Sequence, residues 1–320
     1  MCALFGIHDY SECLNKRQKE LLLKVLSAEC EVRGTHATGI SYIRNGQLEV
    51  YKRPIPAHKM QYNLPPEVKV IMGHTRFTTQ GSERNNYNNH PFFGRVKQNT
   101  FTLAHNGILR NDKELRQSMK LPKTNIETDS YIAAQLIERE GCISFGSLRK
   151  VAETVTGSFV FTVLDNRDNL YFVRGDNPLC IYHFDKGFYL YASTEDILMK
   201  TVVRLGIEKY AHEEIPVEMG DILMIGSSGK VEKEQFEVAY NYAPPYSYQQ
   251  YPVYLYERNS QAYKTTDADD DYLKILKQIS GLYGYTPQDV EELLAEGWTL
   301  SDIEQILYDD SFYSDMASGS

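Results

Sequence analysis

The pattern of apolar and polar positions predicts short strands that alternate with groups of helices. Strand-like stretches occur at 3–7, 39–43, 48–51, 68–73, 101–105, 159–164, 170–174, 179–183, 188–192 and 221–225. Asn45-Gly46, a dipeptide that favours tight hairpin turns, separates the second and third of these stretches. Helical spacing of apolar residues predicts helices within 11–29, 112–119, 129–139 and 195–205. This pattern is typical of an α+β fold with packed antiparallel sheets and helical layers.

The chain changes character after residue 239. Eight tyrosines and three prolines fall between residues 240 and 263 without clear periodicity, which indicates an extended linker over 240–269. Apolar residues then return at helical spacing around Leu273, Val290 and Ile303, which predicts a small three-helix bundle over 270–310. We therefore expect a main domain over 2–239, the linker, and the bundle.

Composition and charge narrow the class of protein. The chain has 320 residues, 42% of them apolar and 24% charged, as in ordinary globular proteins. No apolar run approaches the roughly 20 residues of a membrane helix, so we expect no membrane association. The net charge is −9, and residues from Tyr240 onward hold 4 basic against 14 acidic side chains. An acidic C-terminal quarter argues against nucleic-acid binding.

Cysteine and histidine spacing offers no support for a metal or disulfide framework. The five cysteines are odd in number and show no CxxC spacing, and the eight histidines lack the spacing of metal ligands. We expect no metal and no cofactor, and a reducing cytoplasm fits best.

Candidate chemistry begins at the second residue. Cys2 follows Met1 directly and is small enough for the methionine to be removed. Cys2 would then combine a thiol with a free α-amine whose ordinary pKa is about 8, a nucleophile and a base on one residue. Taken alone, Cys2 could equally be an ordinary strand residue.

Four further stretches carry polar or glycine residues beside predicted elements. They are Arg33-Gly34, the string from Gly73 to Gly81 (GHTRFTTQG), His105-Asn106-Gly107, and Glu127-Thr128-Asp129. Each has an ordinary interpretation by itself: Arg76 as a surface cation, Asn106-Gly107 as a turn, and Asp129 as an acid at a helix N-terminus.

In this order, and with Asn89-His90-Pro91 after the polar loop, the stretches resemble the class II glutamine amidotransferases. The catalytic domain of that family belongs to the N-terminal nucleophile hydrolases. The sequence looks closest to the glutaminase domains of glucosamine-6-phosphate synthase and amidophosphoribosyltransferase, over roughly residues 2–236. The resemblance implies a four-layer α/β/β/α sandwich and L-glutamine as substrate.

The resemblance also implies roles for individual residues. Cys2 matches the nucleophile, and Asn106 with the Gly107 N–H matches the oxyanion hole. Arg76 matches the residue that holds the substrate carboxylate, and Asp129 the one that holds its ammonium. Further positions match the lining of the substrate pocket: Arg33, Gly34, Phe77, Thr79 and Gln80.

The sequence departs from those relatives beyond the first domain. The C-terminal bundle is too small for a sugar isomerase or phosphoribosyltransferase, so we expect a separate synthase to accept the ammonia. The turn at Leu282-Tyr283-Gly284-Tyr285 looks like the loop of ubiquitin-associated domains, which suggests a protein partner for the bundle or a packing appendage. Two alternatives remain: a glutamine-sensing or scaffolding protein without turnover, and a hydrolase for another amide.

Overall fold

The computed structural model describes residues 2–238, together with 273–274, 276–278, 280, 285–295, 300 and 303. The chain divides into two compact units, Met1–Ser247 and Tyr248–Ser320. The predicted linker over 240–269 lies outside the described residues.

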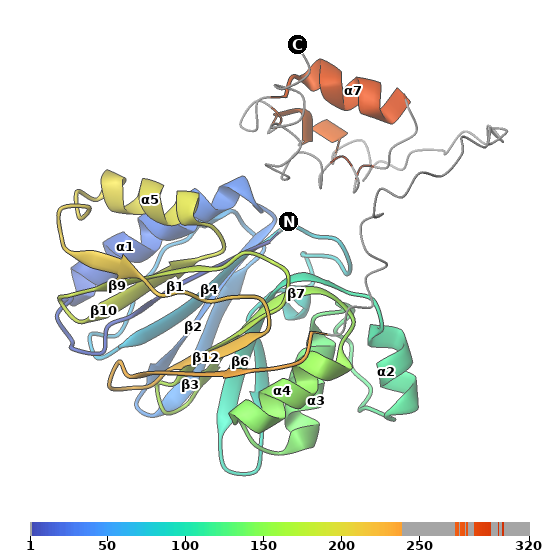
Figure 1. Ribbon diagram of the computed structural model, residues 1–320, viewed down its shortest axis with the longest axis horizontal. Helices are drawn as coiled ribbons and strands as arrows, with labels where there is room; N and C mark the ends of the chain where they lie inside the picture. The colour runs from blue at the N-terminus through green and yellow to red at the C-terminus, as the bar shows by residue number, and fades with distance from the viewer. Residues whose placement is uncertain are drawn as a thin grey trace, which may run out of the picture. The chain divides into compact units, whose positions relative to one another are not determined.

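Two antiparallel sheets form the first unit (Figure 1). The larger has seven strands in the order β11-β9-β10-β1-β4-β2-β3. Its strands are β1 (Ala3–His8), β2 (Ala37–Arg44), β3 (Gln47–Arg53), β4 (Val70–Arg76), β9 (Cys180–Phe184), β10 (Phe188–Ala192) and β11 (His212–Glu214).

The smaller sheet has six strands in the order β13-β12-β8-β7-β6-β5. Its strands are β5 (Phe92–Arg95), β6 (Thr100–Leu109), β7 (Gly157–Asp165), β8 (Leu170–Arg174), β12 (Asp221–Ile225) and β13 (Val231–Gln235). Every neighbouring pair in both sheets is antiparallel, as the sequence pattern predicts.

The first strand lies in the middle of the larger sheet. All six residues of β1 are buried, because β4 and β10 pair with its two edges and both of its faces are covered. Side chains alternate between the faces of a strand, so Phe5 and Ile7 pack toward the helices. Leu4 instead packs toward the second sheet, in a core shared with Val160 and Phe172.

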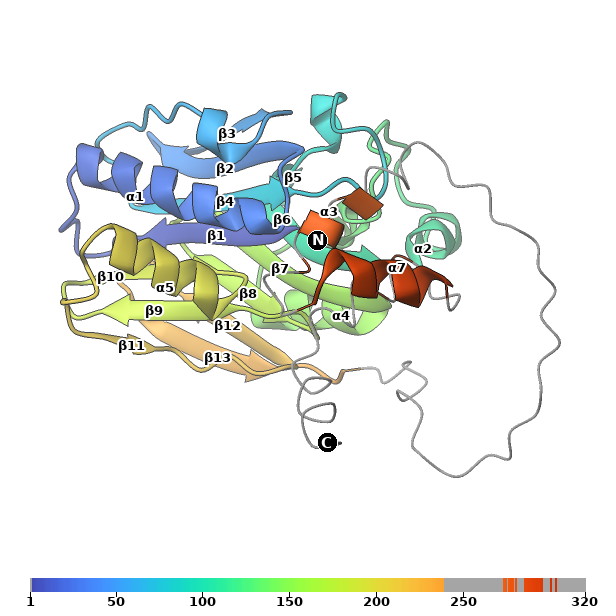
Figure 2. The same cartoon turned by 90° about the horizontal axis from the view of Figure 1, so that it is seen from above.

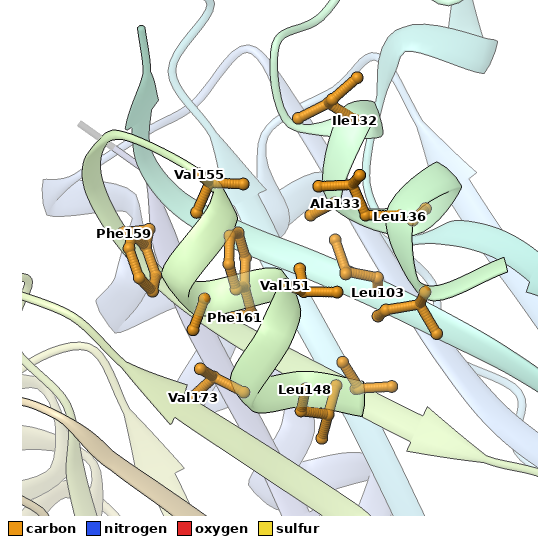
Figure 3. Close-up of a cluster of buried hydrophobic side chains, with 14 of the residues drawn as sticks. Leu103, Ile132, Ala133, Leu136, Leu148, Val151, Val155, Phe159, Phe161 and Val173 are labelled. Carbon is orange, nitrogen blue, oxygen red and sulfur yellow. The ribbon is translucent and has the colours of Figure 1, made fainter. Parts of the chain in front are cut away.

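Helices cover the outer faces of both sheets (Figure 2). The larger sheet packs on α1 (Lys16–Glu29) and α5 (Glu195–Arg204) through one apolar core. The smaller sheet packs on α3 (Tyr131–Glu140) and α4 (Phe145–Thr154), where Val151 lies among Leu103 and Phe161 of the sheet (Figure 3). A short helix, α2 (Asp112–Ser118), contributes Leu115 to the same core.

Local sequence signals account for several boundaries. Helix α1 begins after Asn15, whose side chain accepts the Gln18 N–H while the Gln18 side chain accepts the Asn15 N–H, a capping box. Asn45 and Gly46 have φ values of 50° and 73°, the left-handed pair that a two-residue hairpin requires. The hairpin predicted from this dipeptide is therefore confirmed.

Other elements were not predicted from the sequence pattern. These are α4, β5, β11 and β13. The last two are a three-residue strand and a strongly charged edge strand, which lack the apolar alternation on which strand prediction rests. Helix α3 begins at Tyr131 and not at Asp129, because the Asp129 carboxylate accepts the Leu109 N–H before the helix starts.

The second unit contains one described helix, α7 (Pro287–Ala295). Leu276, Val290 and Ile303 are buried against one another in it. Much of the predicted first and third helices falls outside the described residues, so the three-helix bundle stays a prediction. Within the described part of the chain, no helix is both long and apolar enough to cross a membrane.

Candidate active site

Cys2 lies at the start of the central strand, beside the end of β4. Ala3 pairs with Thr75, so Cys2 is next to the chain as it leaves β4. The Cys2 Sγ accepts the Phe77 N–H at 3.4 Å and lies 3.5 Å from the Phe77 carbonyl oxygen. Burial raises the pKa of the Cys2 thiol, while Arg76 and Arg33 act against the rise. The resting group is therefore a neutral thiol that needs a base to become a nucleophile.

Arg33 fixes the backbone of Cys2. Its Nε donates to the Cys2 carbonyl oxygen at 2.8 Å, and the residue is 6% exposed. The neighbouring Gly34 lies so close to β4 that a Cβ would meet the Arg76 carbonyl carbon at 2.5 Å and the Phe77 nitrogen at 2.6 Å. The Arg33-Gly34 pair thus positions the nucleophile candidate with a guanidinium and a close backbone approach.

Arg76 is a buried cation held by neutral groups. Its Nη1 donates to the Asn89 Oδ1 at 2.7 Å, and its Nη2 donates to the carbonyl oxygens of Gln80 and Gly81 at 2.6 and 2.7 Å. Within the described residues no carboxylate forms an ion pair with it. Arg76 is 3% exposed, and its positive charge remains available to an anionic ligand.

The loop after β4 is fastened to the segment before α3. The Asn88 Nδ2 donates to the Glu127 Oε2 at 2.7 Å, and the Glu127 N–H donates back to the Asn88 Oδ1 at 2.9 Å. This reciprocal pair connects the loop that follows Arg76 to the segment that contains Asp129.

Asn106 and Gly107 lie inside β6. By itself, the Asn-Gly dipeptide favours a turn. They are not a turn: Asn106 pairs with Val160 and Gly107 with Phe159 of β7. Gly107 has φ 138°, and a Cβ there would meet the Ser158 carbonyl oxygen at 2.0 Å. Asn106 is fully buried, yet neither its Nδ2 nor its Oδ1 has a hydrogen-bond partner among the described residues.

Asp129 is buried at the entrance to α3. Its Oδ2 accepts the Leu109 N–H at 2.6 Å, and the Ser130 hydroxyl lies 3.5 Å from its Oδ1. Burial lowers the pKa values of Arg76 and His105, and the negative charge of Asp129 acts in the opposite direction on both. Arg76 is therefore within electrostatic reach of both Asp129 and Cys2.

The remaining predicted pocket residues lie on the loop after β4. The Phe77 ring stacks on His36 with 4.8 Å between ring centroids, and the His36 Nδ1 accepts the Thr78 N–H at 3.0 Å. Gln80 contributes its backbone carbonyl to Arg76, and its side chain is half-buried. Thr79 is exposed. In the described residues no three His, Cys, Asp or Glu side chains are grouped as metal ligands.

A family model described as a glutamine amidotransferase domain matches residues 74–200, the span that contains Arg76, Asn106, Gly107 and Asp129. Residues 74–200 are therefore similar to glutamine amidotransferase domains. Glutamine–fructose-6-phosphate aminotransferase (isomerizing) of Staphylococcus aureus is 29% identical over 248 residues, which cover 75% of this chain and 39% of that protein. The Staphylococcus epidermidis enzyme of the same name is 28% identical over 242 residues, or 73% of this chain and 38% of that protein. The chain thus spans about two-fifths of the length of these curated relatives.

Two solved structures share the fold of the amidotransferase domain. Glutamine phosphoribosylpyrophosphate amidotransferase from Bacillus subtilis, complexed with ADP and GMP, superposes with a TM-score of 0.60 at 21% identity, covering 74% of this chain and 49% of that one. A structure of the allosteric regulatory enzyme of purine biosynthesis gives 0.58 at 22% identity, with the same coverage. The resemblance to class II amidotransferases seen in the sequence is confirmed.

Sequence reasoning missed Lys52. It is half-buried on β3, and its Nζ donates to the carbonyl oxygens of Asn89 and Pro91 at 2.5 and 3.1 Å. A signal was present: Leu48, Val50 and Lys52 share one face of a strand, and a lysine at the end of an apolar face needs a partner. The groups that pair with Lys52 are distant from it in sequence, so the strand pattern does not reveal which they are.

Proposed function

We propose that the protein hydrolyses the side-chain amide of L-glutamine, with Cys2 as nucleophile after removal of Met1. The products are glutamate and ammonia. The observation that carries most weight is Asn106, a fully buried amide without a partner inside an amidotransferase domain. An unpartnered buried amide costs stability, and a group of this kind is retained where a ligand supplies the missing hydrogen bond.

The reaction needs only groups of this chain and a water molecule. The Cys2 α-amine takes the thiol proton through a water, and the sulfur attacks the amide carbon to form a C–S bond. The oxyanion accepts hydrogen bonds from the Asn106 Nδ2 and the Gly107 N–H. The C–N bond then breaks as the ammonium of Cys2 returns its proton to the departing nitrogen, which leaves as ammonia. Water attacks the resulting γ-glutamyl thioester, releasing glutamate and the thiol.

Opposed charges select the substrate. A free amino acid carries a carboxylate and an ammonium, and Arg76 and Asp129 offer one charge for each. Arg33, Gly34, Phe77, Thr79 and Gln80 line the pocket in this proposal. An amide without the amino-acid head would lose both ionic contacts, which argues against a general amidase.

The proposal extends to the organisation of the protein. The domain follows the four-layer sandwich of N-terminal nucleophile hydrolases, in a reducing cytoplasm where all five cysteines stay free. The ammonia passes to a synthase that is present as a separate partner. The C-terminal bundle offers a contact for a protein partner.

The decisive experiment measures glutamate release from glutamine by purified protein, with Cys2→Ala as the test variant. We expect a loss on the order of 1000-fold or more, because the nucleophile is removed. Cys13→Ala is the matched control, since Cys13 is exposed and lies beyond the other end of β1, and it should retain full activity.

Mass spectrometry of the mature N-terminus completes the test. A free Cys2 amine is required by the mechanism, so retention of Met1 in active protein would rule the mechanism out. Equal activity of wild type and Cys2→Ala would do the same. Binding of glutamine without hydrolysis by either protein would instead identify a glutamine sensor.

A further inference from the structure

Lys52 belongs to a closed hydrogen-bonded ring beside the candidate site. Its Nζ donates to the Asn89 carbonyl oxygen, and its own carbonyl oxygen accepts the Asn86 Nδ2 at 2.9 Å. The Asn89 Nδ2 donates to the Asn86 Oδ1 at 3.2 Å and closes the ring. Gly39 makes this approach feasible, because a Cβ there would meet the His90 carbonyl oxygen at 2.1 Å and the Lys52 Cβ at 2.7 Å.

A further hydrogen bond connects this ring to Arg76. The Asn89 Oδ1 accepts the Arg76 Nη1 at 2.7 Å, while the Asn89 Nδ2 also donates to the Glu83 carbonyl oxygen at 2.8 Å. Asn89 therefore has its amide orientation fixed by donors and acceptors on both sides. Lys52 holds the backbone of the residue whose side chain orients the guanidinium.

Lys52 is repelled by the positive charge of Arg76, and no carboxylate of the described residues forms an ion pair with it. Burial, followed by repulsion from Arg76, lowers the pKa of Lys52 to about 8. The Lys52 Nζ also lies over the Phe92 ring, 5.3 Å from its centroid, so an aromatic face stabilises the cation in place of a paired carboxylate.

We propose that Lys52 is a positioning residue that acts through Asn89 to hold the Arg76 guanidinium for the carboxylate of the substrate. The inference rests on the proposed function, because it takes glutamine as the ligand of Arg76. It predicts an effect of Lys52 on substrate affinity and little effect on the chemical step.

The test compares steady-state glutaminase kinetics of Lys52→Met with those of wild type. At pH 7 we expect KM for glutamine to rise about tenfold while kcat stays within about twofold. Lys52→Arg should recover part of the affinity. The control is Lys230→Met, an exposed lysine paired with Glu232, which should leave both constants unchanged. Partial unfolding of a variant lowers the apparent kcat but not KM, so the readout survives a loss of stability.

Two further measurements separate positioning from a general structural role. If Lys52 acts through Asn89, the double variant Lys52→Met/Asn89→Ala should raise KM no more than the larger single change. The ratio of the variant KM to the wild-type KM should also fall as pH rises through about 8, because wild-type Lys52 then loses its charge. Taking the ratio removes the titration of glutamine itself.

Each outcome has a distinct meaning. A KM that is unchanged in Lys52→Met, or a ratio that stays constant with pH, overturns this inference while active wild type keeps the proposed function intact. Wild type that neither binds nor hydrolyses glutamine overturns the proposed function, and this inference with it.

Discussion

At the scale of single residues, Asn106 shows a conflict between stability and chemistry. Its amide is fully buried and unpartnered, whereas Asn177 nearby donates to the Asn106 carbonyl oxygen at 3.2 Å and to the Ser158 hydroxyl. Two buried asparagines of the same domain therefore differ in whether the fold itself uses their side chains. That difference gives them opposite expected responses to truncation.

Asn106→Ala should lower kcat on the order of 100- to 1000-fold with little change in KM, because one oxyanion donor is lost. Its free energy of unfolding should stay within about 1 kcal/mol of wild type, since no hydrogen bond of the fold is broken. Asn177→Ala should instead lose about 1–3 kcal/mol in urea unfolding. A loss of stability in Asn106→Ala as large as in Asn177→Ala would contradict this account.

Candidate residues could be found from the sequence where their chemistry is visible in a short string. Such strings contain Cys2, Arg76, Asn106 and Asp129, and the structure places Arg76 within electrostatic reach of both Cys2 and Asp129. Lys52 could not be assigned a role, because its partners lie about 40 residues along the chain. A side-chain contact between strands depends on register, which a single sequence does not determine.

At the scale of elements, two glycines with positive φ serve different purposes. Gly107 has φ 138° and no room for a Cβ beside Ser158. Gly46 has φ 73° in an open hairpin turn, where an added Cβ would meet no other atom within 4 Å. The first glycine is required by packing between β6 and β7, and the second only by the backbone conformation of the turn.

Gly107→Ala should reduce the free energy of unfolding by about 3 kcal/mol or more, since strain at this φ adds to a steric clash with backbone. Glutaminase activity should be lost with it. Gly46→Ala is the matched control and should cost about 1–2 kcal/mol, with unchanged kcat and KM. Urea unfolding followed by circular dichroism measures both. Equal losses in the two variants would show that packing against Ser158 is unimportant.

Elements were predictable where a local signal coincides with the tertiary contact. The β2–β3 hairpin follows from its Asn-Gly turn, and α2 begins at the expected residue. Helix α3 starts two residues late because Asp129 is engaged by the Leu109 N–H, a contact from outside the helix. Edge strand β13 is charged along its exposed length, which protects a sheet edge and removes the pattern that would reveal it.

At the scale of the whole molecule, the fold buries four histidines in their neutral form. They are His8, His74, His90 and His105, each no more than 3% exposed. Burial lowers the pKa of His8 to about 4 and of His74 to about 3, and lowers the pKa values of His90 and His105 as well. The rings of His90 and His74 are tilted by 34° with 4.1 Å between centroids, so protonation of both would place like charges together.

These histidines predict a fall in stability on acidification. The unfolded chain protonates them near their ordinary pKa of about 6.5, whereas the folded chain does not, so stability is complete above that pH and decreases as pH falls toward 4. Each histidine contributes up to about 1.4 kcal/mol per pH unit. Urea unfolding between pH 7.5 and 5.5 measures the slope.

His8→Phe should make that slope shallower, because it removes a buried imidazole whose pKa the fold lowers. A slope that is the same in wild type and His8→Phe would show that His8 does not contribute.

The central place of β1 in its sheet also sets an order of events during synthesis. Strand β1 is synthesised well before β10, which begins at Phe188 and is its second neighbour. At about 5–20 residues per second, one edge of β1 remains without that partner for on the order of 10 to 40 seconds. The larger sheet can therefore be completed only late in synthesis, and the backbone groups along this edge of β1 stay unpaired until then.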